Sequence, residues 1–101
     1  MRVHGNWCGP DWTGGKHLSV DEYVAQGGDW SEPAIDTVDA SCKKHDRGCV
    51  NGCSRAADIR FIGAMNRYLA NPWNQIRHPI VSTKARYMRS AIMAAMIFRS
   101  R

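Results

Sequence analysis

Two stretches of the chain carry apolar residues at three- and four-residue steps, the spacing of one face of a helix. The positions that share a face are Val38, Cys42, His45 and Cys49 in the first stretch and Asp58, Ile62, Met65 and Leu69 in the second. Because Pro33 suits a first helical turn, we expect the first helix to begin near it and to end at Gly52. The second helix is expected over residues 54–69, closed by Asn71-Pro72.

Four further segments complete a predicted fold that is mainly α. Residues 4–16 are rich in Gly, Pro, Asn and Asp without a period, which predicts a structured loop. Ser19 and Glu22 fit a capping box at the start of a short helix over residues 19–26. A looser stretch over residues 72–79 precedes a last helix over 82–99. Its expected inward residues are Tyr87, Met88, Ala91, Ile92, Ala95 and Phe98.

Length and composition favour one small domain over residues 1–101, in which a covalent or metal staple would support a modest core. The candidate staples are the four cysteines, Cys8, Cys42, Cys49 and Cys53. They allow three pairings, among which the sequence alone does not choose. The formal net charge of +5 suits a polyanionic surface, either nucleic acid or an anionic membrane. No apolar run approaches the roughly 20 residues that cross a bilayer, and we see no hydrophobic signal segment.

Candidate chemistry comes from polar residues that stand in apolar stripes. His45 lies in the stripe of the first helix and Asp58 in that of the second. If the helices pack antiparallel through these stripes, the imidazole and the carboxylate meet in a desolvated interface. Such a pair fixes the imidazole tautomer and leaves its other nitrogen free to take a proton from water. A purely structural histidine satisfied by a core acid is an equally good interpretation of the pair taken alone.

Asp46 and the Gly- and Pro-containing loop over residues 7–15 favour the chemical interpretation. Asp46 follows His45 about 100° around the helix, so its carboxylate can face the same cleft. Calcium takes carboxylate and backbone carbonyl oxygens, which a tightly turned loop supplies. A bond between Cys8 and Cys42 would hold this loop against the helix that carries His45.

These features together resemble the secreted phospholipases A2. The similar segments are the helix Pro33-x-x-Asp36-x-Val38-Asp39-x-x-Cys42-x-x-His45-Asp46, the loop Trp7-Cys8-Gly9-Pro10-Asp11, and the segment Ala57-Asp58-Ile59-Arg60-Phe61-Ile62. The last resembles the compact phospholipase A2 domains of parvovirus capsid proteins. The resemblance covers roughly residues 4–65. It implies two antiparallel catalytic helices with an N-terminal calcium-binding loop and support from disulfides, to which the pattern of residues 82–99 adds a C-terminal helix.

The resemblance also implies an activity, the calcium-dependent hydrolysis of the sn-2 ester of glycerophospholipids to fatty acid and lysophospholipid. His45 would be the general base and Asp58 would orient the imidazole. The Gly9 N–H would help to stabilise the oxyanion. The ligands of Ca²⁺ would be the Asp46 carboxylate and the backbone carbonyls of Trp7, Gly9 and Asp11.

Four positions depart from the family pattern, and two of them, Ser41 and Gly48, stand at usual disulfide positions. Asp11 stands where the family prefers Gly, and Asp tolerates a positive φ better than most residues do. Cys49 replaces a tyrosine that usually supports the catalytic acid, and Tyr68 is a candidate substitute. A bond between Cys49 and Cys53 would form only if Gly52 lets the helix end bend.

The expected partner is an anionic phospholipid surface rather than a specific nucleic acid. Tryptophan favours the headgroup level of a membrane, and the candidates are Trp7, Trp12 and Trp30. Cationic residues that would add attraction are Lys84, Arg86, Arg89, Arg99 and Arg101. We expect a secreted or virion-associated protein.

Two other functions compete with this hypothesis. Cysteines 42, 49 and 53 with His45 offer zinc ligands, and the basic charge would suit nucleic acid. However, these positions make a helical stripe about 16 Å long, which one ion cannot gather unless the helix breaks. The second alternative is a catalytically silent lipid-binding relative, which the presence of His45, Asp46 and Asp58 argues against.

Overall fold

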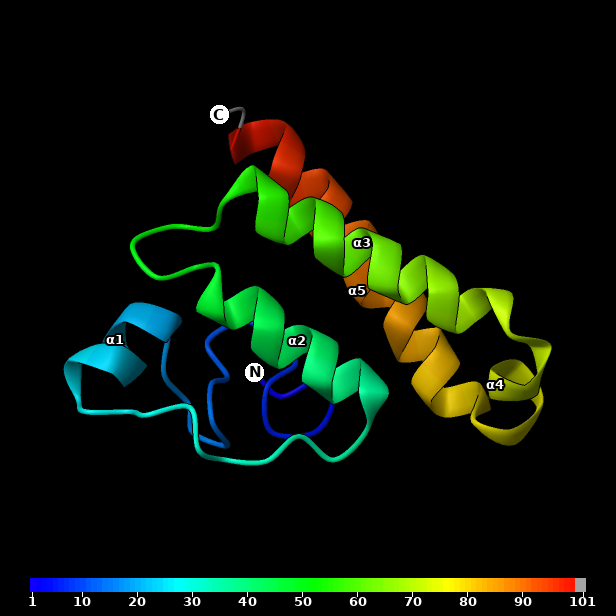
Figure 1. The fold of residues 1–101 in the computed structure, drawn as a ribbon, viewed down its shortest axis with the longest axis horizontal. Helices are drawn as coiled ribbons and strands as arrows, with labels where there is room; N and C mark the ends of the chain where they lie inside the picture. Colours follow the sequence, from blue (N-terminus) through cyan, green and yellow to red (C-terminus); the bar gives the residue numbers. More distant parts are fainter. Residues whose placement is uncertain (100–101) are drawn as a thin grey trace.

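The computed structural model describes residues 1–99, and it is mainly helical (Figure 1). Its helices are α1 (Val20–Ala25), α2 (Thr37–Arg47), α3 (Arg55–Ala70), α4 (Pro72–Arg77) and α5 (Pro79–Arg99). The described residues contain no β-strand, only two isolated bridges within the N-terminal loop. The mainly α class predicted from the sequence is therefore confirmed.

Helix α3 is the central element, because it packs against both α2 and α5. Helices α2 and α3 run in opposite directions, and α5 returns along α3 so that its last turn lies beside the first turn of α3 (Figure 1). The loop before α1 lies against α2, and its residues line one cavity together with residues of α5. Buried side chains from all these parts form one core, made of Trp7, Cys8, Tyr23, Val38, Cys42, Phe61, Met65, Leu69, Ala85 and Met88.

Side-chain caps set where the helices begin. Ser19 caps α1 in a reciprocal capping box with Glu22, as predicted, and Ser54 caps α3. Helix α2 begins at Thr37 and not near Pro33, because the Asp36 side chain accepts a hydrogen bond from the backbone N–H of Asp39. Residues 31–36 form no helix.

The end of α2 and the C-terminal third also differ from expectation. Helix α2 ends at Arg47, so the predicted end at Gly52 is wrong. The stretch after Asn71 forms the short helix α4, which Asn71 caps with its side chain. In α5, the expected inward residue Met88 is buried, but Tyr87 and Phe98 are 54% and 88% exposed and Ala91 is exposed as well. The buried face of α5 instead runs through Ser82, Ala85 and Met88.

Two disulfides link separate segments of the chain. Cys8–Cys42 joins the N-terminal loop to the middle of α2, and Cys49–Cys53 spans the turn between α2 and α3. Both bonds match pairings considered from the sequence. The second lies beyond the last residue of α2, where the chain has left the helix and Gly52 adopts a φ of +102°. Within residues 1–99, no helix is both long and apolar enough to span a bilayer.

Candidate functional site

His45 and Asp58 form a hydrogen-bonded pair between α2 and α3. His45 Nε2 lies 2.7 Å from Asp58 Oδ1. The two side chains are 8% and 0% exposed. Both residues lie on the helix faces that the periodicity predicted, and the tilted ring of Phe61 packs beside the imidazole with centroids 5.3 Å apart. The pair is therefore held in a largely desolvated interface.

The electrostatics of the pair favour a neutral imidazole beside an ionised carboxylate. Burial lowers the pKa of His45, although the hydrogen bond with Asp58 opposes this shift. Burial acts to raise the pKa of Asp58, but hydrogen bonds from Arg99 and His45 outweigh it and leave this pKa below its ordinary value. Because Asp58 Oδ1 accepts a hydrogen bond from Nε2, Nε2 carries the proton of the neutral His45 ring. The basic nitrogen is therefore Nδ1.

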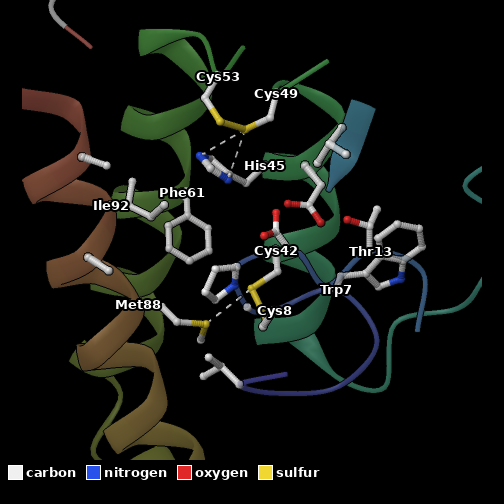
Figure 2. A pocket seen from close by; sticks show the side chains of 18 of the residues that line it. Trp7, Cys8, Thr13, Cys42, His45, Cys49, Cys53, Phe61, Met88 and Ile92 are labelled. Atoms are coloured by element: carbon white, nitrogen blue, oxygen red, sulfur yellow. Dashed lines mark hydrogen bonds between the residues drawn. A yellow bond between two sulfur atoms is a disulfide. The ribbon is translucent and has the colours of Figure 1, made fainter. Parts of the chain in front are cut away.

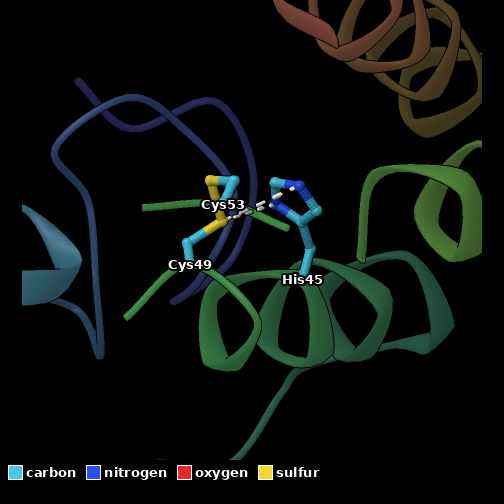
Figure 3. Close-up of side chains that lie close together, drawn as sticks. All are labelled: His45, Cys49 and Cys53. Atoms are coloured by element: carbon cyan, nitrogen blue, oxygen red, sulfur yellow. Dashed lines mark hydrogen bonds between the residues drawn. A yellow bond between two sulfur atoms is a disulfide. The ribbon is translucent and has the colours of Figure 1, made fainter. Parts of the chain in front are cut away.

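The Cys49–Cys53 disulfide covers one face of the imidazole (Figure 3). Cys49 Sγ lies 3.7 Å from His45 Nδ1 and 3.8 Å from Nε2, so the sulfur is nearly equidistant from the two nitrogens. A disulfide sulfur carries no proton, and this contact is therefore packing against the ring. Nδ1 is thereby left without a hydrogen-bond donor from the described part of the chain.

The second group that holds Asp58 is Arg99, from the last turn of α5. Arg99 Nη1 lies 2.5 Å from Asp58 Oδ1, the same oxygen that accepts from His45. Tyr68, the candidate substitute for the missing tyrosine, makes no hydrogen bond to Asp58 among the described residues and lies about three helical turns further along α3. The expectation for Tyr68 is therefore wrong. The other carboxylate oxygen of Asp58 is buried without a partner.

Asp46, the neighbour of His45 on α2, has an unsatisfied carboxylate. Its Oδ2 is buried and makes no hydrogen bond. Burial, with a smaller contribution from the charge of Asp39, raises the pKa of Asp46 to about 8. A buried carboxylate oxygen without a partner is costly in a folded protein and calls for a cation or a donor.

The N-terminal loop is anchored by Asp39, a residue that in the sequence stood out only as part of the α2 motif. Its fully buried carboxylate accepts the backbone N–H groups of Asn6, Trp7 and Ile35. A Cβ added at Gly5, where φ is +60°, would meet this carboxylate at 2.3 Å. The sequence feature that indicates such an anchor is an acid in the first turn of a helix that follows a Gly-rich loop.

Backbone carbonyls alternate in use along this loop. Cys8 O accepts hydrogen bonds from Val3 N and His4 N, and Pro10 O accepts one from the N-terminal ammonium group. No hydrogen bond among the described residues uses the carbonyls of three other residues, Trp7, Gly9 and Asp11. Asp11 adopts the positive φ, 50°, that its place in the loop suggested.

The loop, α2 and α5 enclose a cavity of about 420 Å³ (Figure 2). His45 and Asp46 line it from α2, and Phe61 lines it from α3. The N-terminal loop contributes Val3, Cys8, Gly9, Pro10 and Asp11, and α5 contributes Tyr87, Met88, Ala91, Ile92, Ala95 and Arg99. The walls are mostly apolar, and the polar side chains among them include those of His45, Asp46 and Arg99.

The tryptophans predicted to meet a membrane are only partly at the surface. Trp7 is 1% exposed and stacks on Trp30, with ring centroids 5.4 Å apart, so it belongs to the core and its assignment to an interface is wrong. Trp12 and Trp30 are half-buried. Arg86 and Arg89 make hydrogen bonds to neighbouring side chains. Another cationic residue considered above, Arg101, lies outside the described residues.

The ligand atoms of His45, Cys49 and Cys53 lie within 4.8 Å of one another. This is the only part of the predicted zinc set that comes together, because Cys42 is bonded to Cys8. Zinc binds cysteine as the thiolate, and all four cysteines are in disulfides. In this oxidised state the cluster is a packing contact and offers one nitrogen ligand.

No protein-family model, curated protein or solved structure matches this chain. The inference of function therefore depends on the chemistry of the site itself.

Proposed function

We propose that this protein is a calcium-dependent phospholipase A2, which hydrolyses the sn-2 ester of glycerophospholipids. One observation carries the proposal: the buried His45–Asp58 pair opens onto an apolar cavity that also contains an unsatisfied carboxylate, that of Asp46. A proton acceptor, a cation ligand and a space for an acyl chain are the parts that this hydrolysis needs.

His45 would act as the general base. Its Nε2 is engaged by Asp58, which leaves Nδ1 to accept the proton of a water that attacks the ester carbonyl. The ionised Asp58 would stabilise the imidazolium that forms and would keep the ring in one orientation. The lowered pKa of His45 keeps the imidazole neutral, and so competent as a base, at neutral pH.

The residues around Asp46 fit a hard cation such as Ca²⁺. The unsatisfied Asp46 oxygen and the unused loop carbonyls are oxygen ligands of the kind that calcium takes. The residues that would hold the ion are Asp46, through its carboxylate, and Trp7, Gly9 and Asp11, through their carbonyls. When bound, calcium supplies positive charge that polarises the ester carbonyl and stabilises the oxyanion.

The cavity suits a lipid chain. Its apolar walls come from the N-terminal loop on one side and α5 on the other. Tyr87 of α5 lines the cavity and is also 54% exposed, so an apolar surface continues from the cavity to the outside of the protein. The net charge of +5 favours an anionic membrane as the surface from which the lipid is taken.

The test is fatty-acid release from anionic phospholipid vesicles, with Ca²⁺ and with a chelator. Hydrolysis is expected to need calcium and to fall at least about 1,000-fold in His45→Gln, which removes the base. Asp46→Asn should remove the response to calcium. His78→Asn and Asp29→Asn are matched controls, because both side chains are exposed and neither residue lines the cavity. Full activity in His45→Gln would refute the assigned role.

A zinc-binding function is the second candidate, and the proximity of His45 to Cys49 and Cys53 favours it geometrically. It requires reduction of the Cys49–Cys53 bond. Elemental analysis separates the two: stoichiometric zinc in the purified protein, without calcium-dependent hydrolysis, would replace our proposal. Calcium binding and vesicle binding without any hydrolysis would instead indicate a catalytically silent lipid-binding protein.

A further inference from the structure

The last turn of α5 reaches the proposed site. Helix α5 runs for 21 residues back along α3, and its end lies beside the start of α3 (Figure 1). Asp58 stands in the first turn of α3 and Arg99 in the last turn of α5. The helix dipoles favour an acid at the first place and a cation at the second, so each residue occupies the helix end that suits its charge.

Arg99 is the only group besides His45 that satisfies the Asp58 carboxylate within the described chain. Both donate to Oδ1, and Oδ2 has no partner. Asp58 is fully buried, whereas the Arg99 side chain is 30% exposed and lines the cavity. Without Arg99, a buried carboxylate would keep a single hydrogen bond from a neutral imidazole, which is a poor way to hold a charge in a desolvated interface.

We propose that Arg99 is a positioning residue of the reaction, which keeps Asp58 ionised and aimed at His45 in the place where a phospholipase A2 would use tyrosine. This inference rests on the proposed function and adds to it an active-site contact from α5, a helix outside the segments that resemble the family. A guanidinium fits the position because it is always charged and donates in fixed directions. The charged groups facing the His45 ring are then Asp58 and Arg60 from α3 and Arg99 from α5, with Asp46 beside it on α2.

Two variants separate charge from hydrogen bonding. Arg99→Gln keeps a donor but loses the charge, and Arg99→Lys keeps the charge with a shorter reach. With a short-chain phospholipid below its micelle concentration, Arg99→Gln is expected to lower kcat about 10- to 100-fold with KM changed less than about twofold. Arg99→Lys should recover part of kcat. The control Arg67→Gln, at an exposed position of α3 that does not line the cavity, should leave kcat unchanged.

Three results would overturn the inference. One is a folded Arg99→Gln protein with unchanged kcat. A second is an increase in KM alone, which would make Arg99 a contact for the lipid. The third comes from the unfolding free energies of Asp58→Asn, Arg99→Gln and the double variant, measured in urea. If the two residues are paired, the changes in unfolding free energy are strongly non-additive; if they act independently, the changes add. Additive effects would refute the pairing.

The unfolding cycle needs no enzymatic activity, so it separates this inference from the proposed function. If the parent protein hydrolyses no phospholipid but the two substitutions are non-additive, the proposed function fails, and the role of Arg99 in the reaction fails with it while the ion pair stands. If hydrolysis is present and the substitutions are additive, only the inference about Arg99 fails. Should Arg99→Gln not fold, Arg99→Lys carries the same comparison, with reduced kcat and unchanged KM expected.

Discussion

Asp46→Asn is expected to stabilise the calcium-free protein and to remove its stabilisation by calcium. In the absence of a cation, the carboxylate has a buried oxygen without a partner, and its pKa is raised from 3.8 to about 8. The unfolded chain then loses its proton near pH 4 while the folded protein keeps it. Because the folded state binds the extra proton, stability contributed by this group falls as pH rises from about 4 to 8, and stays at its lowest above 8.

The magnitude follows from the size of the shift. At 1.36 kcal/mol per pKa unit, the cost of ionising Asp46 in the folded state reaches an upper limit of about 6 kcal/mol above pH 8, and about 4 kcal/mol at pH 7. Asparagine has nearly the same shape and no charge, so Asp46→Asn avoids this cost. Calcium at 100 times its dissociation constant would raise the unfolding free energy of the parent protein by about 2.7 kcal/mol and would leave that of the variant unchanged.

The measurement is urea unfolding, followed by far-ultraviolet circular dichroism, at pH 5.5, 7 and 9 with chelator or with calcium. The advantage of Asp46→Asn over the parent should grow with pH in chelator and shrink in calcium. Asp29→Asn, at an exposed position, controls for the loss of one negative charge. The reasoning is refuted if parent and Asp46→Asn show the same pH dependence in chelator, or if calcium stabilises both equally.

Three further substitutions test how the site is held. Gly5→Ala should cost about 2–4 kcal/mol of unfolding free energy, measured by denaturation, because its Cβ would meet the Asp39 carboxylate at 2.3 Å and φ is positive; equal stability would contradict the loop anchor. Replacing Cys8 and Cys42 by alanine should cost roughly 4 kcal/mol, since that bond spans 34 positions of sequence, and an unchanged urea midpoint would count against the pairing. Phe61→Ala should lower the unfolding free energy by about 3–5 kcal/mol and lower hydrolysis as well, because Phe61 is 4% exposed and lines the cavity. A loss of stability with unchanged hydrolysis would show that Phe61 is a core residue without a role in the site.

Local patterns were enough to predict several elements. The capping box at Ser19 and the periodicity of α3 placed these helices within a residue or two. The apolar stripes of α2 and α3 also predicted that His45 and Asp58 meet, because a polar residue in an apolar stripe needs a partner on the facing stripe. These features depend on neighbours in sequence or on one helix–helix contact.

Other features depend on distant contacts, and the sequence did not indicate them. Helix α2 starts later than Pro33 indicated because Asp36 caps it by accepting the N–H of Asp39, while the Asp39 carboxylate accepts the N–H of Ile35 before the helix. Trp7 looked like an interfacial residue but is drawn into the core by the backbone hydrogen bond that Asp39 accepts. Arg99 could not be matched to Asp58, since that pairing depends on where a 21-residue helix ends after reversing direction.

The ion pair between Asp58 and Arg99 also sets an order of assembly. The two residues are 41 positions apart, and their contact forms only after α3 is complete and α4 and α5 have folded back along it. The pairing of α2 with α3 joins residues only 13 positions apart and carries a smaller loop-closure cost. During synthesis, a chain that has folded only its first three helices would therefore hold His45 beside an incompletely satisfied Asp58. The candidate site is therefore complete only once the last turn of α5 lies beside the first turn of α3.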